Sequence, residues 1–132
     1  MEKRLLQCAV AIVCFVPLSA SLASLIRGPA SIGGVVDVPT DLDSHFRYLS
    51  GIFLAMGVGF VTCIPNIERK TERFRLLAAL VVTGGLARLT SLLVVGAPSR
   101  GHLIGLGVEL GVVPLLTWWQ ARVAQDARSR IT

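Results

Sequence analysis

The sequence predicts an all-α integral membrane protein, a four-helix bundle in which helices adjacent in the chain run antiparallel. Of the 132 residues, 53% are hydrophobic and only 16% are charged, whereas soluble domains carry about 25% charged residues. The apolar residues gather in four runs of about 20 residues, the length that an α-helix needs to cross a bilayer. These runs use most of the chain, so residues 1–132 are expected to form a single domain.

The four predicted spans cover residues 5–26, 42–63, 74–95 and 102–120. The first could be read as a cleavable signal peptide, but its apolar part is longer than a signal core, which favours an uncleaved helix. Gly and Pro make residues 27–40 an irregular loop. Thr40, with Asp43 three residues on, fits a capping-box-like start of the second helix. Pro114 is expected to kink the fourth helix and to free the carbonyl of Leu110, which a hydroxyl such as that of Thr117, or water, could satisfy.

The basic residues are unevenly shared between the two ends of the predicted spans. Nine lie near the termini and in the loop at 64–75, while three lie on the opposite side; the nine are Lys3, Arg4, Arg69, Lys70, Arg73, Arg75, Arg122, Arg128 and Arg130. Because cytoplasmic loops carry the excess of Lys and Arg, both termini are predicted to be cytoplasmic. This indicates a multi-pass membrane protein.

Two charges interrupt the third and fourth apolar runs, Arg88 and Glu109. A charge at such depth costs several kcal/mol unless it is paired or hydrated, so it marks a functional hypothesis. Arg88 lies seven residues before the end of its span, near Val95, and Glu109 lies seven residues after the start of the next span, near His102. At about 1.5 Å per residue, both are roughly 10 Å below the same membrane face. The sequence therefore predicts that the two side chains meet.

The candidate ligand site extends from this pair toward the outer surface. Arg47 lies nearer that surface, His45 and His102 lie at its rim, and Ser91 closes the stretch that contains Arg88. A polar ligand pocket open to the outside, a proton-accepting carboxylate, and a purely structural ion pair that fixes helix order all remain open. A second arginine leaves net positive charge that a structural pair does not require.

Small residues predict where the helices approach one another, since lipid gives apolar helices no hydrophobic reason to associate. The second span has Gly51, Ala55 and Gly59 at a spacing of four. Gly84 and Gly105 each lie one turn before a charge, and we expect them to leave room for a long side chain or water.

Other chemistries find little support in the sequence. Asp41, Asp43 and His45 alternate in a way that could suggest a metal, but alternate positions do not share one helix face, so no metal and no cofactor are predicted. The basic residues do not cluster with aromatic residues, which argues against nucleic acid. No catalytic motif is visible, and no catalytic residue is assigned.

Several stretches resemble a known family. Residues Phe46–Gly57, Gly84–Leu89, Glu109-Leu110 and Leu116–Gln120 look like the bacterial membrane family called domain of unknown function 4345. The resemblance covers roughly residues 5–122 and implies a compact four-helix membrane protein. It carries no established activity, but Arg47, Gly51, Arg88 and Glu109 match its motif positions.

The sequence leaves two hypotheses of function. The first is a non-enzymatic membrane protein that binds a small polar or lipid-like ligand through an outward-facing Arg/Glu site, or an accessory subunit. Its predicted partners are membrane lipid and a larger membrane complex or homo-oligomer. The second is a small membrane enzyme or proton-coupled carrier that uses Glu109 as an acid/base.

Overall fold

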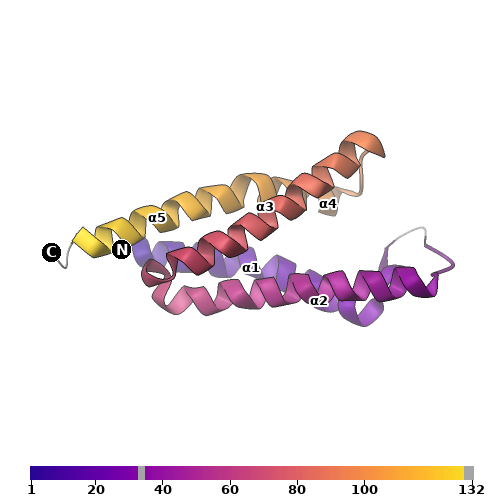
Figure 1. Cartoon of the computed structure of the whole chain (residues 1–132), viewed down its shortest axis with the longest axis horizontal. Helices are drawn as coiled ribbons and strands as arrows, with labels where there is room; N and C mark the ends of the chain where they lie inside the picture. Colours follow the sequence, from indigo (N-terminus) through magenta and orange to yellow (C-terminus); the bar gives the residue numbers. More distant parts are fainter. Residues whose placement is uncertain (33–34, 130–132) are drawn as a thin grey trace. The chain divides into compact units, whose positions relative to one another are not determined.

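A computed structural model describes residues 1–32 and 35–129 and contains four long helical segments (Figure 1). Helix α1 covers Glu2–Arg27, α2 covers Thr40–Cys63 and α3 covers Thr71–Val94. The fourth segment joins α4 (Arg100–Gly107), the π-helical turn η3 (Val108–Val112) and α5 (Val113–Ser129). All four are long and apolar enough to cross a membrane. The predicted all-α class and the four helices are confirmed.

The helices are longer than the predicted spans, most of all at the carboxyl end. Helix α5 continues to Ser129, whereas the fourth span was expected to end near residue 120. Leu116, Gln120, Val123 and Ala124 are all buried, so one helical face stays in the core although the opposite face turns polar. Hydropathy marked the end of the apolar run, not the end of the helix. Arg130, part of the predicted basic tail, and the loop glycines Gly33 and Gly34 lie outside the described residues.

The chain forms two compact units, Cys8–Ile64 and Met1–Gln7 with Pro65–Thr132. In the first unit, α2 packs against α1 where Gly57 faces Leu18: a Cβ atom added at Gly57 would lie 2.7 Å from Leu18 Cδ2. The short 3-10 turn η1 (Pro29–Ser31) also contacts α2. Ser50, Gly57, Phe60 and Cys63 are the buried residues of α2.

The start of α2 differs from the prediction. Thr40 is the first helical residue and Pro39 occupies the N-cap position, with no side-chain hydrogen bond to the end of the helix. Asp43, expected to complete the capping box, accepts a hydrogen bond from Arg47 Nε at 2.8 Å. The carboxylate reaches forward one turn to a cation instead of back to the helix end, so the predicted capping box is wrong.

In the second unit, α3 packs beside α5 and the turn η3 (Figure 1). Phe74 and Ala78 of α3, with Val113 and Leu116 of α5, are buried there. Gln120 is fully buried, and its Nε2 donates to Ile67 O at 2.8 Å and to Thr71 Oγ1 at 2.9 Å. These bonds tie α5 to the 3-10 turn η2 (Ile64–Arg69) and to the first residue of α3. One polar side chain thereby links three elements of this unit, η2, α3 and α5.

The close helix approaches occur at other glycines than those predicted. Within the described residues, a Cβ atom added at Gly51, Gly84 or Gly105 meets no atom within 4 Å. Ala55 is exposed and Gly59 is half-buried. The approaches that the structure shows are at Gly57 and Gly85. That Gly51, Gly84 and Gly105 serve helix packing therefore stays a prediction. It would require contact with a part of the protein, or a partner, outside the compact unit in which each glycine lies.

Two glycines of α2 test this register. We expect Gly57→Leu to lower the free energy of unfolding by about 1–3 kcal/mol, because Leu18 fills the space that the new side chain needs. Gly51→Leu on the same helix is the matched control and should be nearly neutral. Thermal unfolding in detergent measures both. If Gly51→Leu lowered the free energy of unfolding more than Gly57→Leu, the face of α2 that contains Gly51 would be the packed one, as the sequence predicted.

Candidate functional site

The local structure around Glu109 is set by a proline five residues later. Pro114 has no N–H group to donate to the carbonyl of Leu110. The helix widens here into η3, and the N–H of Val113 bonds to Val108 O, five residues back. The hydroxyl of Thr117 donates to Val113 O at 2.8 Å, so it does not serve the Leu110 carbonyl as the sequence suggested. Single π turns inside α-helices are frequent at functional sites.

Arg88 and Glu109 meet as predicted, in a two-point ion pair. Arg88 Nε donates to Glu109 Oε2 at 3.0 Å, and Arg88 Nη2 donates to Oε1 at 3.1 Å. This fork-to-fork geometry is stronger and more directional than a single contact. Glu109 is 8% exposed, while the side chain of Arg88 keeps 31% of its surface exposed. The carboxylate of Glu109 is therefore buried, whereas the side chain of Arg88 is partly exposed.

The pair depends on a close approach at Gly85. A Cβ atom at this buried position would lie 2.9 Å from Glu109 Cβ and 2.8 Å from Leu110 Cδ2. The sequence analysis selected the neighbouring Gly84, which lies a turn before Arg88 but has open space around it. The overlooked signal was the double glycine itself: Gly85 is three residues before Arg88, so it shares a face with it equally well.

Part of the Arg88 guanidinium has no protein partner in the described part of the chain. Its hydrogen bonds go to Glu109 through Nε and Nη2. A guanidinium carries five N–H donors in a planar fork, so Nη1 and one N–H of Nη2 remain for a ligand or water. The arrangement can hold a carboxylate or phosphate oxygen beside a fixed, oriented cation.

Arg47 and His45 belong to the other compact unit, and Arg47 is engaged there. Its Nε binds Asp43, and its Nη1 donates to the backbone carbonyls of Leu25 and Ile26 at the end of α1. It thus satisfies carbonyls that have no partner inside the helix. Gly28 makes room for this contact with φ of 66°, since a Cβ atom there would lie 2.7 Å from Arg47 Nη2. These bonds give Arg47 a structural task that the sequence analysis missed.

The remaining predicted ligand residues are not hydrogen-bonded to the pair in the described structure. His45, His102 and Ser91 are exposed. His102 Nδ1 lies 2.9 Å from Ser99 Oγ, at the start of α4. Their proposed part in ligand binding stays a prediction.

Among the described residues, no group of three His, Cys, Asp or Glu side chains comes together as a metal site would require. Cys8 is exposed, while Cys14 and Cys63 are buried, and all three are free thiols.

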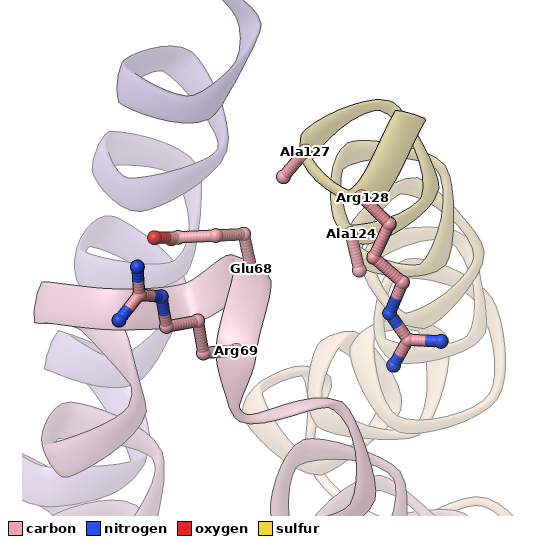
Figure 2. A pocket seen from close by; sticks show the side chains of 5 residues that line it. All are labelled: Glu68, Arg69, Ala124, Ala127 and Arg128. Carbon is pink, nitrogen blue, oxygen red and sulfur yellow. The ribbon is translucent and has the colours of Figure 1, made fainter. Parts of the chain in front are cut away.

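A hollow of about 310 Å³, away from the ion pair, lies where η2 faces the end of α5. Figure 2 shows Glu68 and Arg69 on one side of it, and Ala124, Ala127 and Arg128 on the other. Glu68 Oε1 is 3.0 Å from Lys3 Nζ, while Glu68 Oε2 is buried without a hydrogen-bond partner in the described part.

Fold and site together define an α-helical protein with four segments of membrane-spanning length and one ion pair buried between the last two. The chain belongs to the family described as a domain of unknown function, DUF4345, whose pattern matches residues 5–120. The resemblance seen in the sequence is thus confirmed. No curated protein and no solved structure matches the chain.

The two adjacent glycines of α3 test the site geometry. We expect Gly85→Ala to lower the free energy of unfolding by about 1–3 kcal/mol, since its methyl group would meet Glu109 Cβ, which cannot move without the backbone. Gly84→Ala is the control and should be neutral or stabilising by up to about 1 kcal/mol through helix propensity. Equal effects at the two positions, in detergent unfolding, would contradict the close approach.

Proposed function

We propose that this is a non-enzymatic integral protein of the bacterial inner membrane that binds a small anionic ligand, polar or lipid-like, at Arg88. In this proposal both termini are cytoplasmic, sequential helices run antiparallel, and Arg88 and Glu109 lie nearer the outer face. The same site could serve an accessory subunit of a larger membrane complex, with the bound group shared between subunits.

The observation that carries the proposal is the unequal burial of the two residues of the ion pair: Glu109 is buried and Arg88 is partly exposed. Glu109 is buried and takes both of its hydrogen bonds from one edge of Arg88. The guanidinium of this partly exposed side chain is thereby held in one orientation before any ligand arrives. A pair needed only for helix order would gain nothing from leaving the cation partly open, whereas a binding site requires it.

The geometry favours binding over acid/base chemistry. Both oxygens of Glu109 already accept hydrogen bonds from the Arg88 guanidinium, so the atoms that would exchange a proton are occupied. The alternative of an enzyme or proton-coupled carrier therefore has no observation in its favour.

The ligand class can be tested with two probes, inorganic phosphate and dihexanoyl phosphatidic acid, added to protein purified in detergent. Binding to the folded state should raise the melting temperature, by the equivalent of about 2.7 kcal/mol at a concentration 100 times the Kd. Arg88→Gln should abolish the shift with inorganic phosphate and reduce the shift with phosphatidic acid, each measured from the melting temperature of the variant itself.

Arg100→Gln provides the matched control, because Arg100 is an exposed arginine at the start of α4 on the predicted outer side. It should leave the shift unchanged. If both probes raised the melting temperature of Arg88→Gln as much as that of the wild type, Arg88 would not be part of the binding site. If neither probe raised the melting temperature of the wild type, the ligand would not be an anionic phosphate group.

A further inference from the structure

A groove of about 500 Å³ runs between α3 and α5, at the opposite end of α3 from Arg88. Its lining includes Arg75, Ala78, Ala79 and Val82 of α3, with Thr117 and Trp118 of α5. Arg75 is thirteen residues before Arg88, or about 20 Å along the helix. Neither Arg88 nor Glu109 is among the residues that line this α3–α5 groove, although Val82, which does line it, is only six residues before Arg88.

Small side chains explain why the groove exists. Ala78 is buried and Ala79 is exposed beside it, while the hydroxyl of Thr117 is turned back to Val113 O. The surface along the groove is therefore apolar, between the bulkier Val82 and Trp118. An apolar surface of this kind suits a hydrocarbon chain better than a polar solute.

Two positive charges lie at the groove or next to it. Arg75 lines it, and the guanidinium of Arg122 lies 4.3 Å from the centre of the Trp118 ring, which forms one wall. No carboxylate is among the lining residues. Within the described chain, neither Arg75 nor Arg122 forms a salt bridge. Two guanidinium groups at one apolar channel, beside an exposed tryptophan, complement a phosphate at the membrane interface.

We infer that the α3–α5 groove binds an anionic phospholipid, with one acyl chain along Ala78, Ala79 and Val82 and the phosphate between Arg75 and Arg122. This goes beyond the proposed ligand site at Arg88 and does not depend on it. Arg75 and Arg122 belong to the basic set that predicts the cytoplasmic side, so the lipid comes from the inner leaflet. Bulk lipid of any kind can wet an apolar groove; the guanidinium groups supply the preference for a negative headgroup.

Trp118 provides a direct readout, because bromine atoms on an acyl chain quench tryptophan fluorescence only at short range. The chain has two tryptophans, so Trp119→Phe leaves Trp118 alone. This protein is placed in phosphatidylcholine vesicles that contain increasing fractions of brominated phosphatidylglycerol or brominated phosphatidylcholine. Each guanidinium near the surface should enrich the anionic lipid roughly fivefold, so phosphatidylglycerol should quench at a several-fold lower mole fraction.

Variants assign the preference to the groove. Arg75→Gln should remove most of it, and Ala79→Leu should reduce quenching by filling the channel. Arg128→Gln removes a basic residue of α5 that does not line the groove and should keep the preference. Circular dichroism confirms that each variant is folded.

Equal quenching by the two lipids in the wild type, or an undiminished preference in Arg75→Gln, would overturn the inference. Protection of Trp118 from both lipids would overturn it as well, since protein, such as a second copy of the chain, would then cover the groove.

Discussion

The cost of placing a carboxylate inside an apolar helix is the constraint on which the rest of the second unit depends. Glu109 is buried in a segment of membrane-spanning length, where an unpaired charge costs several kcal/mol. Arg88 offsets this cost with two hydrogen bonds from one planar group. Because both partners must meet at one depth, the pair also fixes how α3 lies against η3. Chain order, helix register and site geometry are thus linked through a single contact.

Two backbone features make this contact possible. Pro114 removes a hydrogen-bond donor, and the helix responds with a π turn that carries Glu109. Gly85 removes a side chain, and Glu109 Cβ occupies the space. Neither feature forms the pair, yet each sets the distance at which the fork of Arg88 reaches the carboxylate. Buried pairs are weak evidence for stability in general. Here the partly exposed cation is what favours a binding role over a purely structural one.

The sequence was most informative where an energetic cost was large. Arg88 and Glu109 could be paired from depth alone, since few other solutions exist for opposite charges in adjacent spans. The rotation of a helix about its axis has no such signature. Gly51 and Gly84 therefore looked equivalent to Gly57 and Gly85 in sequence, although the structure places the close approaches at the latter. Likewise, the bonds from Arg47 to the end of α1 connect residues more than twenty positions apart. No pattern in the residues next to Arg47 could have predicted these contacts.

The central claim is that Arg88 and Glu109 act as one electrostatic unit, and a double-mutant cycle tests it most directly. Reversible unfolding in detergent is measured for Arg88→Gln, Glu109→Gln and the double variant. Each single change should cost about 3 kcal/mol, the lower end of the range for a broken buried pair, because Arg88 is partly exposed. The double variant should recover much of that loss. Strictly additive losses would contradict the account, because they would mean that the two charges do not interact.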